Sequence, residues 1–105
     1  MNLVKEPEII QLTQTAYLIM QPDWVIRASG DHLVTDRHGV RQPKGKYVTI
    51  RPEHTGDIEI IAHTSGHVDI KPHPRHQMTF TSLPDRYLNQ ALRNVIASIT
   101  WRQQR

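Results

Sequence analysis

The clearest alternation of apolar and polar residues runs from residue 57 to residue 71, where the sequence reads DIEIIAHTSGHVDIK. When His63 faces His67, residues 64–66 form a short connection with Gly66 at its left-handed position. One face of the hairpin then carries only aliphatic side chains, namely Ile58, Ile60, Ala62, Val68 and Ile70. Glu59 faces Lys71 on the other side, and this pair of opposite charges supports the register. The pattern predicts the central hairpin of a sheet.

Residues 46–51 are predicted to form the neighbouring strand on one side of this hairpin. Ile50 then pairs with Ile58 on the apolar face, and the same register brings Arg51 opposite Asp57. The apolar and the charged residues therefore indicate the same pairing independently of each other.

Residues 77–81 are predicted to continue the meander on the other side, with Met78 opposite Ile70 and Phe80 opposite Val68. All these strands share one apolar face. A sheet with one apolar and one polar face is typical of antiparallel folds.

The chain before residue 46 is predicted to contribute two further short strands, at residues 24–29 and 32–35. Gly30-Asp31 is interpreted as the turn between them, and residues 36–39 as a second turn. The basic segment 40–46 is interrupted by a proline and a glycine, so it is predicted to be a loop.

Residues 7–20 are predicted to form an N-terminal helix. Pro7 suits the first helical position, and Glu8 lies near the positive end of the helix dipole. At about 100° per residue, one broad side of this helix gathers Ile9, Leu12, Thr13, Ala16, Tyr17, Ile19 and Met20. Leu18 does not fit this side, and an edge strand over residues 15–20 is the competing interpretation. Residues 1–6 are predicted to be a flexible arm.

Residues 84–102 are predicted to form a C-terminal helix that packs on the apolar face of the sheet. Pro84 opens this helix, and Asp85 complements its dipole. The side expected to be buried carries a stripe of apolar residues: Leu88, Ala91, Leu92, Val95 and Ile99.

These elements predict one α+β domain over residues 1–105. It consists of an antiparallel meander of five to six strands, a C-terminal helix packed on one face, and an N-terminal helix beside it. If residues 15–20 are a strand instead, the order of strands followed by one amphipathic helix resembles that of pleckstrin-homology-like barrels. This resemblance concerns the fold alone and implies no function.

The composition is that of an ordinary globular domain, with 37% hydrophobic and 22% charged residues. The sequence has no cysteine, which excludes disulfides and thiolate metal sites. No apolar stretch is long enough for a signal peptide or for a membrane span. We therefore expect a cytoplasmic protein that makes no membrane contact.

The formal net charge of +3 is mild for a nucleic-acid-binding protein. Basic residues nevertheless gather in two polar segments, the predicted loops 37–46 and 71–76. Such loops could follow a phosphate backbone, and the candidate residues are Arg37, Arg41, Lys44, Lys46, Lys71 and Arg75. A nucleic-acid-binding module is accordingly the alternative function.

The sequence carries no catalytic signature. It has neither a G-x-S-x-G nucleophile motif nor a phosphate-binding glycine loop, so we expect no enzyme activity and no cofactor. His63 and His67 share the polar face with Asp69, and two histidines with one carboxylate are a recognised type of open metal site. Histidines beside a hairpin loop are more often solvated surface residues. No metal ligand is therefore assigned, although metal binding by His63 and His67 stays an open question.

Protein binding is the favoured function. Tyr47 is predicted opposite Ile61 on the polar face, where the two form an exposed apolar pair unless they cover each other. Tyr87 and Trp101 lie on the flank of the C-terminal helix, and aromatic residues are favoured at interfaces. We expect a small non-enzymatic intracellular protein that acts through protein–protein contacts, as an adaptor, inhibitor or assembly component. The sequence does not identify the protein partner, and it is compatible with a homo-oligomer.

Overall fold

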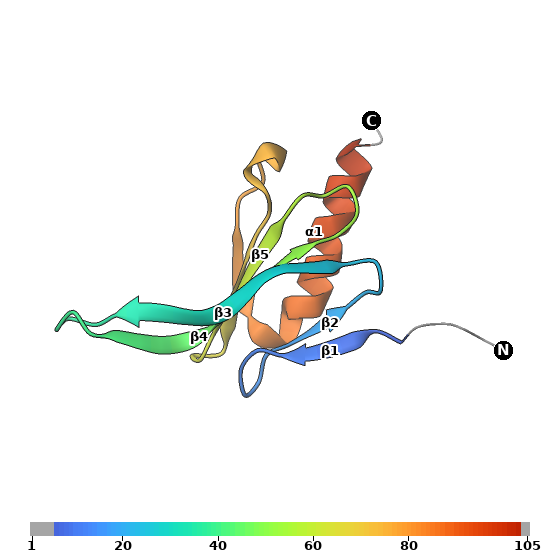
Figure 1. Ribbon diagram of the computed structural model, residues 1–105. Helices are drawn as coiled ribbons and strands as arrows, with labels where there is room; N and C mark the ends of the chain where they lie inside the picture. The colour runs from blue at the N-terminus through green and yellow to red at the C-terminus, as the bar shows by residue number, and fades with distance from the viewer. Residues whose placement is uncertain (1–5, 104–105) are drawn as a thin grey trace.

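The computed structural model of the chain describes residues 6–103 and divides its strands between two antiparallel sheets (Figure 1). Over these residues, the smaller sheet pairs β1 (Glu8–Gln11) with β2 (Tyr17–Met20). The larger sheet holds five strands in chain order: β3 (Val25–Thr35), β4 (Arg41–Arg51), β5 (Ile58–His63), β6 (His67–Lys71) and β7 (Thr81–Pro84). The remaining described elements are the 3-10 turns η1 (Pro74–His76) and η2 (Asp85–Tyr87) and the helix α1 (Leu88–Gln103).

The central hairpin has the predicted register. Glu59 pairs with Lys71, and the residues that follow them along β5 and β6 pair in step. Gly66 closes the connection with a φ of 100°, which glycine adopts readily. Every member of the predicted apolar set is fully buried: Ile58, Ile60, Ala62, Val68 and Ile70.

The predicted pairing of β4 with β5 is also confirmed. Ile50 lies opposite Ile58, and the Arg51 Nε lies 3.2 Å from the Asp57 Oδ1. An exposed ion pair of this kind contributes at most about 1 kcal/mol. The register is therefore held mainly by burial of the apolar face.

The core lies between the larger sheet and two covering elements. The helix α1 contributes Leu88, Leu92 and Ile99, which are buried in one cluster with the sheet residues. The β1–β2 hairpin contributes a second set to the same cluster: Leu12, Ala16, Leu18 and Met20. The C-terminal helix thus packs on the apolar face as predicted, but it does not cover that face alone.

The N-terminal helix predicted for residues 7–20 is wrong, because the described residues of this segment form a β-hairpin. Ile10 pairs with Leu18, and the turn is held by a 3.0 Å hydrogen bond from the Ala16 amide to the Thr13 Oγ1. The competing strand interpretation agrees with β2. Leu18, which fits no helical side, is fully buried. Packing against the sheet has overridden a weak helical pattern.

The last strand differs from its prediction as well. Thr81 pairs with Ile70 in place of Met78, and Leu83 takes the position expected for Phe80. This displacement by three residues reverses the two faces of the strand. As a result Leu83 packs against the core, whereas Phe80 is exposed.

The displacement has a local cause between β6 and β7. The chain forms η1 there, and Gln77 follows it in the left-handed conformation with a φ of 54°. The His76 Nε2 lies 2.6 Å from the carbonyl oxygen of Thr55, which ties η1 to the β4–β5 loop. Pairing with β6 resumes only after this turn, at Thr81.

β3 and β4 are longer than predicted. β3 continues through residues 30–31, where a turn was predicted, and β4 begins at Arg41 within the predicted loop. Two irregularities interrupt their pairing, and bulges of this kind bend and twist a strand pair. The turn over residues 36–39 is confirmed, because the Asp36 Oδ1 accepts hydrogen bonds from the amides of His38 and Val40 at 2.8 and 2.9 Å.

The flexible arm predicted for residues 1–6 lies, apart from Glu6, outside the described residues. No helix within residues 6–103 combines the length and the apolar character needed to cross a membrane.

The outer halves of β3 and β4 and the turn between them extend beyond the rest of the molecule (Figure 1). β4 pairs with β5 only from Gly45 onwards, so β3 and β4 continue beyond that point as a two-stranded hairpin. Residues 31–46, which include the last paired residues at its base, are here named the ribbon. Apart from His32, Asp36 and Gly45, every residue of the ribbon is exposed.

Gly45 marks the point where β4 leaves the sheet. Its φ is 149°, and a Cβ atom at this position would collide with the carbonyl oxygen of Ala62. The Thr64 amide donates a 2.9 Å hydrogen bond to the Lys44 carbonyl at the same place. Only glycine allows the two backbones to approach so closely.

Gly45→Ala is expected to lower the free energy of unfolding by about 2 kcal/mol or more, because it combines an unfavourable φ with a backbone collision. Gly39→Ala is the matched control, since Gly39 has a φ of 80° but no heavy atom within 4 Å of an added Cβ. The control should lose only about 1 kcal/mol, the conformational cost alone. Urea unfolding followed by circular dichroism measures both losses. Equal losses in the two variants would contradict the role given to the close approach.

Candidate functional site

The ribbon holds most of the residues predicted to bind nucleic acid. Four of them lie on it and are exposed, namely Arg37, Arg41, Lys44 and Lys46. The other two lie elsewhere: Lys71 ends β6, and Arg75 belongs to η1. Lys71 pairs with Glu59 near the start of β5, whereas the ribbon leaves the sheet near the end of β5. The structure therefore separates the predicted basic residues into two groups.

The ribbon also carries apolar side chains that the sequence analysis did not select. Leu33, Val34 and Val40 are 48%, 41% and 53% exposed. The signal for Leu33 and Val34 in the sequence was the short strand predicted at residues 32–35, whereas Val40 lay in the predicted loop 40–46.

Of the residues predicted to bind protein, Tyr47 and Ile61 face each other as expected. They do not form an exposed pair, because Ile61 is only 7% exposed. The Tyr47 ring lies over Gly30, 3.0 Å from where a Cβ of that residue would stand. Tyr87 in η2 and Trp101 in α1 are 45% and 57% exposed.

Three histidines and one aspartate come together where the ribbon meets the sheet. His32, His63, His67 and Asp69 are here named the histidine cluster. The rings of His63 and His67 stack with centroids 4.2 Å apart, and His32 meets His63 edge-on at 5.1 Å. The His63 Nε2 lies 2.8 Å from the Asp69 Oδ2. Within residues 6–103, His63, His67 and Asp69 are the one group of potential metal ligands whose donor atoms all lie within 4.8 Å of one another.

The strand register explains the membership of the cluster. His63 ends β5, His67 begins β6, and Asp69 follows two residues later on the same face. His32 comes from β3 and was not predicted to join them. Its ring meets that of His63 across the intervening strand β4, at the point where Gly45 of β4 lies opposite His63. The feature of the sequence that could have indicated this contact is Gly45, the glycine of the strand between them.

Opposing effects act on the carboxylate of Asp69. Burial favours its neutral form, but hydrogen bonds with His63 and Ser82 and the charges of His63 and His67 favour the ionised form more strongly. The pKa of Asp69 therefore lies below its ordinary value of 3.8. The side chains of His63 and Asp69 are only 19% and 16% exposed, so their contact is well shielded from solvent.

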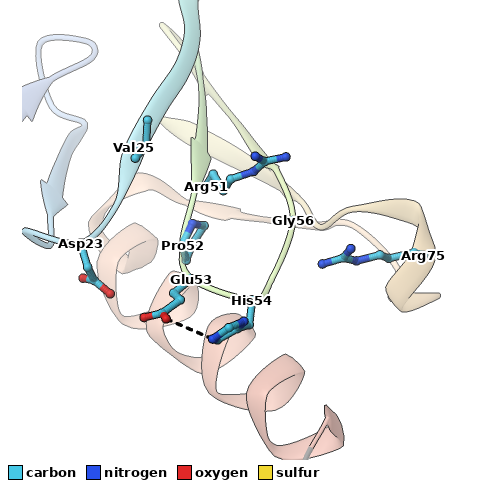
Figure 2. A pocket seen from close by; sticks show the side chains of 8 residues that line it. All are labelled: Asp23, Val25, Arg51, Pro52, Glu53, His54, Gly56 and Arg75. Carbon is cyan, nitrogen blue, oxygen red and sulfur yellow. Dashed lines mark ion pairs between the residues drawn. The ribbon is translucent and has the colours of Figure 1, made fainter.

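A separate surface pocket of about 440 Å³ lies at the end of the sheet away from the ribbon. It is lined by Asp23, Val25, Arg51, Pro52, Glu53, His54, Gly56 and Arg75. Figure 2 shows that its two guanidinium groups and its two carboxylates do not converge on one point, and Glu53 is paired with His54 at 3.1 Å. Because these charges do not converge, this pocket is not taken as the candidate site.

No protein-family model, curated protein or solved structure matches the chain. The candidate site is therefore defined by geometry, as the ribbon and the histidine cluster at its base.

The lowered pKa of Asp69 predicts a pH dependence of stability. Because the unfolded chain binds this proton more tightly than the folded chain, the stabilisation is complete above the unfolded pKa and is lost as the pH falls through the folded pKa. Asp69→Asn should therefore flatten the decline of the unfolding free energy between about pH 5 and about pH 2. Urea unfolding at a series of pH values measures the slope. Glu53→Gln, at an exposed position, is the control, and equal slopes in both variants would refute the role of Asp69.

Proposed function

We propose that the protein is a small non-enzymatic intracellular binding protein that acts through protein–protein contacts made by the ribbon. The observation that supports this most is the exposure of Leu33, Val34 and Val40 on a hairpin outside the core. An isolated two-stranded hairpin is only marginally stable in water, and these apolar side chains lie exposed on the two faces of the ribbon, where a partner can cover them. A partner that covers these side chains would stabilise the ribbon as it binds.

The backbone of the ribbon supports the same proposal. β3 is an edge strand of the larger sheet, and β4 has no pairing with β5 before Gly45. An open edge accepts an extended segment of a partner, with main-chain hydrogen bonds providing affinity and alternate side chains providing specificity. A strand of another protein, or of a second copy of this chain, is the kind of partner proposed.

The combined variant Leu33→Thr and Val40→Thr tests the apolar contact. Threonine keeps the preference for strand structure but removes most of the apolar surface. We expect the variant to fold and to retain its partner at least about tenfold less well in affinity purification from the source cells. Ile9→Thr with Phe80→Thr is the matched control, because both residues are exposed but lie outside the ribbon.

Wild type and control should keep the partner in about 0.5 M salt, because screening acts on charges and not on apolar contacts. Equal retention by the ribbon variant and the control would refute the ribbon as the binding element.

Nucleic-acid binding by the same ribbon is the second candidate function. The supporting observation is that four exposed basic residues share this hairpin, namely Arg37, Arg41, Lys44 and Lys46. A two-stranded ribbon also fits the major groove of duplex DNA. Asp31 and Asp36 reduce the formal excess on the ribbon to two positive charges, a weak electrostatic footprint. Protein binding is therefore the first proposal.

The combined variant Arg37→Gln and Arg41→Gln tests this second candidate, with Lys71→Gln and Arg75→Gln as a control of equal charge. Fluorescence anisotropy with duplex and single-stranded oligonucleotides, at about 50 and 200 mM salt, measures the affinity. Nucleic-acid binding predicts weaker binding and a salt slope smaller by about two units in the ribbon variant only. The absence of any complex with the wild-type chain at low salt would eliminate this function.

A further inference from the structure

We propose that His63, His67 and Asp69 bind a divalent transition-metal ion of the class that includes Zn²⁺, with His32 placed to supply the fourth ligand. Imidazole nitrogens and carboxylate oxygens are ligands of such ions, whereas Mg²⁺ and Ca²⁺ take oxygen ligands. Two histidines with one carboxylate are an established ligand set for zinc. This site is independent of the identity of the partner of the ribbon.

The distances suit a single ion. The three donor atoms already lie within 4.8 Å of one another. In a tetrahedral site with bonds of about 2.1 Å, ligand atoms are separated by about 3.4 Å. Small side-chain rotations close the widest separation, and the 2.8 Å contact between the His63 Nε2 and the Asp69 Oδ2 opens slightly. The ion then takes the place of the proton that these two atoms share.

Hydrogen bonds outside the ligand set orient two of the three ligands. The Ser65 hydroxyl lies 2.9 Å from the Nδ1 of His67. When this Nδ1 carries the proton, the Nε2 of the same ring is the nitrogen that binds metal. Ser82 makes a hydrogen bond to the carboxylate of Asp69. Outer hydrogen bonds of this type fix the tautomer and direction of the ligands in metal sites.

The ligands are carried by rigid backbone. His63 and His67 flank the tight turn of the central hairpin, and Asp69 is paired opposite Ile61 in the same ladder. Sites built on strands hold their ligands more accurately than sites on loops. His32 belongs to the ribbon, so a fourth bond from its ring would join the base of the ribbon to β5.

Isothermal titration of the untagged full chain with ZnCl₂ near pH 7.5 is the primary test. We expect one ion per chain with a Kd on the order of 1 μM or below. Co²⁺ in place of Zn²⁺ should give the intense visible absorption of a tetrahedral site. Saturating Zn²⁺ should raise the Tm by about 5–10 °C, because the ion binds the folded state.

Variants locate the site. His63→Asn with His67→Asn should weaken zinc binding at least about 100-fold, and Ser65→Ala about tenfold through the orientation of His67. His38→Asn with His54→Asn is the matched control, because it removes two histidines outside the cluster. Asparagine tolerates the positive φ of 66° at position 54, and this control should bind zinc as the wild type does. His32→Asn should weaken binding less than the double cluster variant does.

The proposal is overturned by the absence of zinc uptake by the wild-type chain at about 100 μM, or by an equal loss of affinity in the control and the cluster variant. Circular dichroism shows whether the cluster variant folds. If it does not, an unchanged zinc affinity in Ser65→Ala, at an exposed position, also overturns it. Partner binding is measured with a chelator present, so a failure of zinc binding is distinguished from a failure of the proposed function.

Discussion

The inner face of β4, β5 and β6 must be kept from water, and the rest of the fold depends on this constraint. Six aliphatic side chains on it are at most 1% exposed: Val48, Ile50, Ile58, Ile60, Val68 and Ile70. Each such burial contributes about 1.5–3 kcal/mol, and α1 and the β1–β2 hairpin share the covering. Asn89 of α1 joins the two covers, because it accepts a 2.9 Å hydrogen bond from the Ile19 amide and donates a 3.0 Å one to the Tyr17 carbonyl. One side chain thereby supplies β2 with bonds that a further strand would otherwise provide.

The middle of the sheet could be predicted from the sequence because its signals are local and agree with one another. Apolar matching specifies the same register as the charge pairs Arg51–Asp57 and Glu59–Lys71. The N-terminal segment has no such second signal, since its apolar residues fit one side of a helix as well as a hairpin, and Leu18 alone separates the two. β7 offers two apolar choices, Phe80 and Leu83. In the structure Leu83 pairs with Val68, after a turn that the contact between His76 and Thr55 ties to the distant β4–β5 loop.

The candidate site, like the fold, could be predicted from the sequence only in part. The grouping of His63, His67 and Asp69 follows from the β5–β6 register, so it could be read from the sequence. The ribbon could not, because Pro43 and Gly45 usually interrupt strands. Pro43 is tolerated because this part of β4 has a strand partner on one side only. Residues that would disrupt an interior strand mark, in this chain, the place where a strand leaves the sheet.

Gly45 also joins the ribbon to the histidine cluster. Its missing side chain lets β4 pass the Ala62 carbonyl, and it lies opposite His63, whose ring meets that of His32 at 5.1 Å. The base of the ribbon and the cluster are therefore one structural unit. On the two proposals made above, a partner that moved the ribbon would displace His32 from His63, and an ion held by His32 together with the rest of the cluster would restrain the ribbon. Such a coupling would be reciprocal, so partner affinity measured with and without Zn²⁺ would differ by the same factor as zinc affinity measured with and without the partner.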